Sequence, residues 1–245
     1  MLKIRRITIL LLLACLLIGC FGGCEKAPAG TTGVADTTAP SVTEPVIEEV
    51  DYAGQVKLNM NTATAKTEAT VKQFIDGDTT HFIVPASVMP NGVLKARYLA
   101  INTPESTGKI EEYGKKASNF TKEKLSSATS IIIESETDTR NADSTGDRYL
   151  VWIWYKTAES EDYRNLNIEI LQNGLAIANN TGASRYGKSG VAAIDQAKAY
   201  QLNMFSGKPD PEFYYGDAVE LTLSELRNNI EKYNGMKVAF NGVIT

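Results

Sequence analysis

The sequence predicts a small α+β domain in which a five-stranded, barrel-like sheet carries helices after its third and fifth strands. Short apolar segments separated by turn residues fill the first part of the body, as expected for consecutive strands. Segments with apolar residues at helical spacing follow in two places. Of the 245 residues, about 140 form this body, and such a domain buries roughly two thirds of its unfolded surface. A hydrophobic core of that size can sustain the fold without disulfides.

The first three strands are expected to follow one another through tight turns. Phe74 and Ile75 precede Asp76-Gly-Asp-Thr79, and Phe82-Ile-Val84 follows, so apolar segments flank an Asp-Gly pair, which is a strong hairpin signal. Met89-Pro-Asn-Gly92 predicts the second turn. The third strand then runs through Arg97-Tyr-Leu-Ala-Ile-Asn-Thr-Pro-Glu105 and ends at Thr103-Pro104, because proline cannot donate to a strand ladder.

The remaining elements alternate between helix and strand. Apolar residues at helical spacing over residues 113–128 predict the first helix. Residues 130–136 and 148–155 are the fourth and fifth strands. Two further helices are expected over residues 166–175 and 191–205, for a total of three.

The first residues are typical of an export signal. A basic start, residues 1–6, precedes an apolar run over residues 7–19 that is too short for a comfortable membrane span. The run closes on Leu17-Ile-Gly-Cys20, which resembles the cleavage box of bacterial lipoproteins, so residues 1–19 are expected to be removed and Cys20 to be lipidated. Cys15 and Cys24 fit this pattern less well. A plain signal peptide with an incidental cysteine is the alternative.

Residues 20–66 are rich in Ala, Thr, Pro, Gly and acidic residues, which predicts a flexible tether. A lipid anchor followed by a tether places the domain at the outer face of the bacterial cytoplasmic membrane, or outside the cell after release. All three cysteines lie within the first 24 residues, so the body has no thiolate metal site. The net charge of -4 argues against broad electrostatic adhesion to nucleic acid, but a local basic cleft stays possible.

Residues 209–245 are expected to lie outside the main body. A linker rich in Pro, Gly and acidic residues precedes a short helix up to Tyr233, for which Ser224 is the expected N-cap. An apolar strand follows Gly235. Because a lone strand is unstable, this region is interpreted as the start of a second β-rich domain or as a segment that docks on the body.

Several residues carry chemistry of a recognisable kind. Asp76 and Asp78 would project to one side of an extended chain, and clustered carboxylates suit Ca²⁺, although Asp-Gly-Asp alone is more often a turn. Arg97 and Arg148 each begin a strand, and the guanidinium fork suits a phosphate, although such an arginine alone is usually solvated. Glu105 could activate a water molecule.

The order and spacing of these blocks are more specific than any one of them. Phe74-Ile-Asp-Gly-Asp-Thr79, Arg97-x4-Asn-Thr-Pro-Glu105, Glu112-Tyr-Gly-x2-Ala-Ser-x-Phe-Thr-Lys122 and Asp147-Arg148 occur in one series. Over residues 70–205 the chain resembles the staphylococcal nuclease (thermonuclease) family. The resemblance implies an OB-type five-stranded barrel with three helices, and a Ca²⁺-dependent endonuclease that hydrolyses phosphodiester bonds of DNA and RNA.

The resemblance also implies roles for individual residues. Asp78 would bind Ca²⁺ directly, Asp76 would support it through water, and Thr103 would offer its backbone carbonyl. Arg97 and Arg148 would hold the scissile phosphate. Glu105 would orient or deprotonate the attacking water. The single histidine, His81, has no role in this pattern and is expected at the surface.

Three positions depart from the family pattern. Asn102 stands where an aspartate would ligate Ca²⁺, and this removes one negative charge from the site. Residues 176–181 lack the tyrosine expected in the nucleotide pocket, for which Tyr186 is a nearby substitute. Phe205 replaces the usual tryptophan.

The leading hypothesis is therefore a surface-anchored, Ca²⁺-dependent nuclease that acts as a monomer. One alternative is a non-catalytic module that binds nucleic acid, weakened in metal binding by Asn102. Another is a surface lipoprotein that uses the fold for protein contacts. The full set of acidic and basic residues favours the nuclease.

Overall fold

The computed structural model of the protein describes residues 49–240. The predicted signal peptide, Cys20 and most of the predicted tether lie outside the described residues. Within residues 49–240, no helix is long and apolar enough to cross a membrane.

The body is a closed barrel of five strands. These strands are β1 (Lys66–Phe74), β2 (Thr79–Ile83), β3 (Val93–Tyr98), β5 (Ser130–Ser135) and β6 (Tyr149–Lys156). They are ordered β3-β2-β1-β5-β6, and a parallel pairing of β3 with β6 closes the barrel, while the other pairs are antiparallel. The predicted OB-type α+β fold is thus confirmed. The short strand β7 (Arg164–Asn165) extends the sheet beyond β6.

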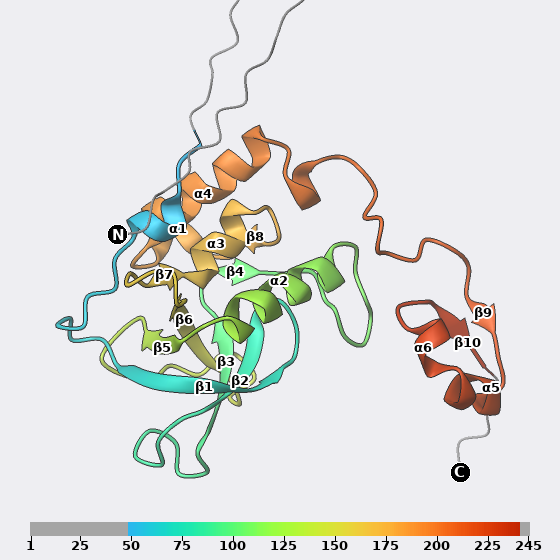
Figure 1. Ribbon diagram of the computed structural model, residues 1–245, viewed down its shortest axis with the longest axis horizontal. Coiled ribbons are helices and arrows are strands. Elements are labelled where there is room, and N and C mark those ends of the chain that lie inside the picture. The colour runs from blue at the N-terminus through green and yellow to red at the C-terminus, as the bar shows by residue number, and fades with distance from the viewer. Residues whose placement is uncertain (1–48, 241–245) are drawn as a thin grey trace, which may run out of the picture. The chain divides into compact units, whose positions relative to one another are not determined.

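Three main helices accompany the barrel, as predicted: α2 (Gly114–Ser126), α3 (Leu166–Gln172) and α4 (Gly187–Ala199). Figure 1 shows α3 and α4 together at one end of the barrel, above the strands. A two-stranded ladder of β4 (Ile101–Asn102) and β8 (Ile177–Ala178) joins the exit of β3 to the segment after α3. Two 3₁₀ turns, Thr181–Ala183 and Asn203–Phe205, flank α4.

Two helices end earlier than their apolar patterns predict. The helix α3 ends at Gln172 because Gly174 follows in the left-handed region, with φ of 63°. The helix α4 ends at Ala199, and Gln201 and Asn203 both have positive φ, which interrupts helical geometry before the 3₁₀ turn that holds Phe205.

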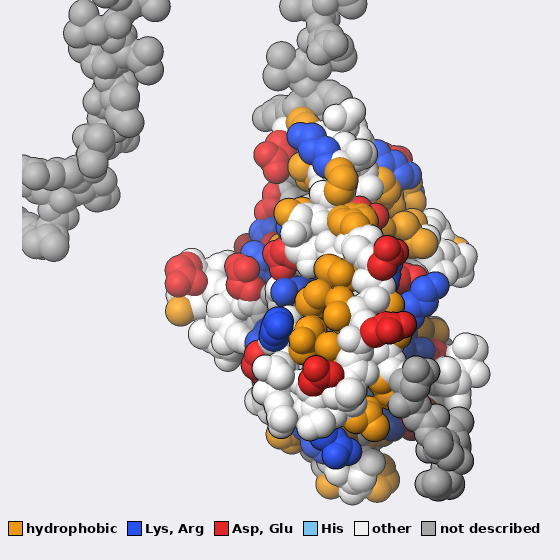
Figure 2. Space-filling model, turned by 90° about the vertical axis from the view of Figure 1, so that its right-hand side faces the viewer, with side chains coloured by type: hydrophobic (Ala, Val, Ile, Leu, Met, Phe, Trp, Pro, Cys, Tyr) orange, Lys and Arg blue, Asp and Glu red, His pale blue; other side chains and the backbone are white. Residues whose placement is uncertain are grey.

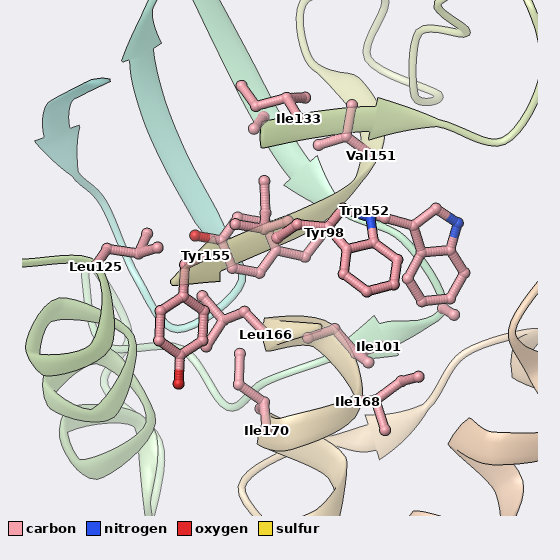
Figure 3. Close-up of a cluster of buried hydrophobic side chains, with 14 of the residues drawn as sticks. Tyr98, Ile101, Leu125, Ile133, Val151, Trp152, Tyr155, Leu166, Ile168 and Ile170 are labelled. Carbon is pink, nitrogen blue, oxygen red and sulfur yellow. The ribbon is translucent and has the colours of Figure 1, made fainter. Parts of the chain in front are cut away.

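The core fills the barrel and the space between the barrel and its helices. Strand β3 alternates outward and buried residues, whereas β6 is buried at consecutive positions. Figure 3 shows Tyr98 and Trp152 from the strands packed with Leu166 and Ile168 from α3. Each such side chain contributes about 1.5–3 kcal/mol when removed from water. This core holds the strand ends in place, and the candidate site lies at those ends.

The folded region begins earlier than the sequence predicted. A short helix, α1 (Tyr52–Gln55), packs against the body through Ala53, which is fully buried. The Val50 backbone exchanges two hydrogen bonds with the Gln196 side chain, and Asp51 forms a two-fold ion pair with Arg164 at 2.6 and 2.8 Å. The described end of the expected tether is therefore part of the domain, because its polar groups and one apolar residue find partners there.

The C-terminal region contains β9 (Val219–Glu220), α5 (Leu223–Asn228), α6 (Ile230–Tyr233) and β10 (Val238–Ala239). The strand after Gly235 is not alone, because β10 pairs in parallel with β9. Thr222 caps the N-terminus of α5 and forms a capping box with Glu225. The prediction that Ser224 is the N-cap was wrong. That this region opens a second domain stays a prediction.

Candidate functional site

The Asp76-Gly-Asp78 turn joins β1 to β2, and its two carboxylates are buried. The turn is not extended as predicted, because the backbone N–H of Asp78 donates to Oδ1 of Asp76 at 3.2 Å. Gly77 lies against α2 and the exit of β4. A Cβ added there would come within 2.9 Å of Ala117 and Thr103, so only glycine fits this close approach.

Arg97 lies directly across from this turn. It projects from the outward face of β3, opposite Thr79 in β2, and only 12% of its side chain is exposed. Its Nη1 is 2.5 Å from Oδ2 of Asp78, and its Nη2 donates to Oδ1 of Asn102 at 2.6 Å. The carbonyl of Ile101 also accepts from Nη1 at 3.3 Å. Arg97 therefore connects two of the four predicted metal ligands.

Thr103 closes the same cluster from the third side. Its backbone N–H donates to Oδ2 of Asp78 at 2.8 Å, and the residue is buried. The structure thus brings Asp76, Asp78, Asn102, Thr103 and Arg97 together. Asp76 joins through the turn, and the other four join through direct hydrogen bonds or ion pairs.

The pKa of Asp78 is raised to about 6, first because burial disfavours its charged form. The Arg97 charge and the Thr103 N–H act in the opposite direction, whereas the neighbouring Asp76 charge adds to the rise. The charged form of Asp78 is therefore stabilised by Arg97 and by the Thr103 N–H against the cost of its burial.

Arg148, which directly precedes β6, is held by a carboxylate that the sequence did not point to. Its Nε and Nη2 both lie 2.7 Å from Oδ2 of Asp143. Asp143 is itself fixed by the N–H and the hydroxyl of Thr145. Burial raises the pKa of Asp143, but hydrogen bonds from Thr145 and Arg148 outweigh this effect, so the pKa lies below its usual value. The Asp-x-Thr spacing, which is typical of a side-chain-capped turn, was the available signal.

Arg97 and Arg148 line one cleft of about 460 Å³. The remaining lining residues come from the loop after β3, from the turn that carries Asp143, and from the segment after β8: Tyr98, Leu99, Ala100, Ile101, Asp143, Ser144, Leu150, Asn179 and Asn180. Two arginine side chains in one cleft are suited to bind a phosphate between them.

A left-handed residue shapes the wall of this cleft. Ala100 has φ of 71°, which a non-glycine residue adopts only at a cost of about 1–2 kcal/mol. Its carbonyl accepts hydrogen bonds from the N–H of Asn179 and from the hydroxyl of Thr181. These contacts tie the exit of β3 to the loop after β8 and stabilise the strained conformation. Sequence reasoning had not identified Ala100, Asn179 or Asn180.

Glu105 lies further along the loop and is exposed. Its backbone, and not its carboxylate, anchors the segment: the N–H of Glu111 donates to the Glu105 carbonyl at 2.8 Å, and the Glu105 N–H donates to the Glu111 carboxylate at 3.1 Å. Gly114 permits this fold, since a Cβ there would come within 2.1 Å of the Glu105 carbonyl oxygen. Among the described residues, neither cleft arginine pairs with Glu105.

Tyr186 does not line the cleft of the two arginines. Its hydroxyl donates to Oε2 of Glu134 at 2.9 Å, and its ring packs edge-on against Trp152 and Trp154. The fully buried Glu134 carboxylate accepts the hydrogen bond of this hydroxyl, so the structure gives Tyr186 a structural contact, and its contact with substrate stays a prediction. His81 is partly exposed on the outer face of β2, as expected.

The oxygen donors at Asp76, Asp78, Asn102 and Thr103 are of the type that Ca²⁺ takes, which includes neutral carbonyls as well as carboxylates. Over residues 49–240 there is no group of three or more His, Cys, Asp or Glu side chains arranged for a metal. A calcium site would thus depend on the amide and the backbone carbonyl. Arg97 would also have to release the Asp78 and Asn102 oxygens that it contacts.

Comparison with known proteins supports the fold. The family model described as staphylococcal nuclease homologue matches residues 95–207. This range includes Arg97, Asn102, Thr103, Glu105 and Arg148, but begins after Asp76 and Asp78. No curated protein matches the chain.

Proposed function

Because the domain that contains residues 95–207 belongs to the staphylococcal nuclease family, we propose that this protein is a nuclease that hydrolyses phosphodiester bonds of DNA or RNA. One observation carries the proposal. Arg97 in β3 and Arg148, which directly precedes β6, line the same cleft. Structural ion pairs alone would not require both guanidinium groups to face one cavity.

Each arginine is held by a carboxylate, Asp78 for Arg97 and Asp143 for Arg148. These pairs position the guanidinium groups before substrate binds, and a phosphate entering the cleft would share them through its own oxygens. In the transition state the phosphate carries more negative charge on its oxygens, so the arginines bind it more tightly than they bind the ground state. Loss of one such donor costs about 100- to 1000-fold in rate.

We assign Glu105 as the group that orients or deprotonates the attacking water. Its carboxylate is exposed, and the residue follows Pro104 directly after Asn102 and Thr103, two of the proposed metal ligands. Catalytic hydrogen bonds often form only when substrate is bound, so the assignment does not require Glu105 to pair with Arg97 or Arg148 before substrate binds.

The cofactor is proposed to be Ca²⁺, held by Asp78, Asn102 and the Thr103 carbonyl, with Asp76 acting through water. When bound, the ion would act as a Lewis acid and a template for the phosphate. Arg97 would then turn from Asp78 and Asn102 toward the substrate. Because Asn102 is neutral, the site would bind Ca²⁺ less tightly than a site with a third carboxylate.

The cellular setting is also a proposal. The basic and apolar start, the Cys20 box and the tether composition support export and lipid anchoring at the outer face of the cytoplasmic membrane. Figure 2 shows acidic and basic side chains interspersed on the face turned toward the viewer. Binding of nucleic acid is therefore expected to depend on local clusters such as the arginine cleft, and not on a broad basic surface.

The test is hydrolysis of plasmid DNA and of RNA by the full chain, with millimolar-range Ca²⁺ and with chelator. Arg148→Ala is expected to lower the cleavage rate by about 100-fold or more. Arg185→Ala serves as a control, because Arg185 is exposed and does not line the cleft. An equal rate for both variants would show that the cleft does not cut nucleic acid.

The second candidate is a module that binds nucleic acid without cutting it. The observation that favours it is the pairing of Arg97 with both Asp78 and Asn102, which occupies the predicted metal ligands. DNA binding retained in Ca²⁺ without any cleavage would support this candidate over the nuclease.

A further inference from the structure

The outer face of the barrel beside Arg97 carries further basic residues in register. Along β3 the outward positions are Val93, Lys95 and Arg97, and the residues between them are buried. The cross-strand partner of Lys95 is His81, just as the partner of Arg97 is Thr79. Lys95 and His81 therefore continue the line that starts at the arginine cleft.

A bulge in the neighbouring strand adds a second lysine. Gln73 of β1 pairs with His81, and the register between β1 and β2 shifts between Val71 and Gln73. Lys72 is the extra residue in this bulge, and both Lys72 and Gln73 are exposed. A bulge re-aims a side chain that strict alternation would send to the other face. Lys72, His81 and Lys95 form what we call the basic strip.

Electrostatics supports the closeness of the three groups. The pKa of His81 is lowered, first by burial and then by the charges of Lys95 and Lys72, while Asp147 acts in the opposite direction. Both lysines are thus within electrostatic reach of one imidazole.

Among the described residues, the strip has one acidic partner, Asp147, and its ion pair with the strip is weak because it is exposed. Lys95 pairs with Asp147, and the two side chains are 40% and 68% exposed. An exposed pair of this kind contributes at most about 1 kcal/mol, so a phosphate can replace the carboxylate at little cost.

We propose that the basic strip binds backbone phosphates of a single nucleic-acid strand whose neighbouring phosphate lies at Arg97. Alternate residues on one strand are about 6.6–6.8 Å apart, and adjacent strands are about 4.8 Å apart, so Lys95 and then Lys72 extend stepwise from the cleft. Their flexible side chains follow a backbone without reading bases. The inference rests on the proposed function, because Arg97 must hold a phosphate of the same strand.

The consequence is a contribution that depends on substrate length. An oligonucleotide of about 12 nucleotides reaches from the cleft across the strip, whereas a dinucleotide occupies the cleft alone. Each phosphate contact on a single strand contributes about 0.7 to the slope of log affinity against log salt.

The experiment compares Lys72→Ala/Lys95→Ala with the matched control Lys115→Ala/Lys122→Ala, which removes two exposed charges from α2. Binding of the full chain to a fluorescent single-stranded 12-mer is measured by anisotropy in chelator over a range of salt. The strip variant is expected to bind about tenfold more weakly near 0.1 M salt and to lose about 1.4 of the salt slope. Thermal unfolding establishes that both variants are folded.

Equal losses in strip and control variants would overturn the proposal, as would failure of the unmodified chain to bind the 12-mer. Dinucleotide cleavage in Ca²⁺ is measured in parallel. If the unmodified chain cleaves neither the dinucleotide nor the 12-mer, but the strip variant still binds the 12-mer more weakly than the control variant does, hydrolysis is refuted and the strip is supported. Normal cleavage without a strip effect refutes the strip alone.

Discussion

Tyr186→Phe separates a structural role of this tyrosine from the substrate contact that the sequence suggested. The change removes only the hydroxyl, which donates to Glu134 at 2.9 Å, and keeps the ring that packs against Trp152 and Trp154 at centroid distances of 5.0 and 5.3 Å. Glu134 is fully buried and also accepts from Thr64 and Trp154. Removing one of its donors therefore weakens a buried charged network.

The expected magnitude follows from the type of bond. A hydrogen bond to a charged group contributes about 1.5–3 kcal/mol. In a domain of this size each kcal/mol shifts the melting temperature by about 2–4 °C, so Tyr186→Phe is expected to lower it by roughly 3–12 °C. The pKa of Tyr186 is raised by burial and by Glu134, so the hydroxyl stays protonated and donates throughout the neutral range.

The assay combines thermal unfolding with cleavage kinetics measured well below the melting temperature. The structure predicts a clear loss of stability with an unchanged KM. An unchanged melting temperature together with a raised KM would refute this reasoning and restore Tyr186 as a substrate-binding residue. Tyr186→Ala also removes the ring contacts and is expected to cost about 3–5 kcal/mol.

Three further predictions concern the site and the N-terminal segment. Asn102→Asp is expected to tighten Ca²⁺ binding about tenfold, since affinity follows ligand charge, and calorimetry that finds unchanged affinity would exclude Asn102 as a ligand. Gly77→Ala is expected to cost about 1–3 kcal/mol in urea unfolding, because the new methyl group would meet Thr103 at 2.9 Å, and an unchanged midpoint would contradict the close packing. Asp51→Asn is expected to lower stability by at most about 1 kcal/mol at neutral pH, because the Asp51 pair with Arg164 is half-exposed. The Arg164 hydrogen bond lowers the pKa of Asp51. The stability that the pair contributes is therefore present above the unfolded pKa of about 3.9 and is lost as pH falls through the folded pKa. A stability difference between Asp51→Asn and the unmodified chain that persists at lower pH would contradict the pair.

The amino-acid sequence by itself predicted the barrel, which the structure confirms, and proposed a set of site residues whose roles stay predictions. Apolar alternation and the Asp-Gly and Pro-Asn-Gly turns are local signals, so they predict strands and hairpins without knowledge of distant contacts. The same local logic expected Arg97 and Arg148 to begin strands. Arg148 does directly precede β6, but Arg97 lies near the end of β3 (Val93–Tyr98), so the predicted third strand over residues 97–105 was wrong in its bounds. The local logic also failed at Ser224, since two possible caps lie close together and only the hydrogen bonds select Thr222.

The tertiary structure decided which partners these residues have. Asp143 holds Arg148, and Arg97 joins Asp78 to Asn102. The Asp-x-Thr spacing indicates a capped turn at Asp143, but it does not predict which group this carboxylate binds. Tyr186 turned to the buried Glu134 because a buried charge must be satisfied wherever a donor can reach it. The Arg97–Asp78 and Tyr186–Glu134 pairs join groups that are far apart in the chain, so they depend on barrel closure, about which periodicity carries no information.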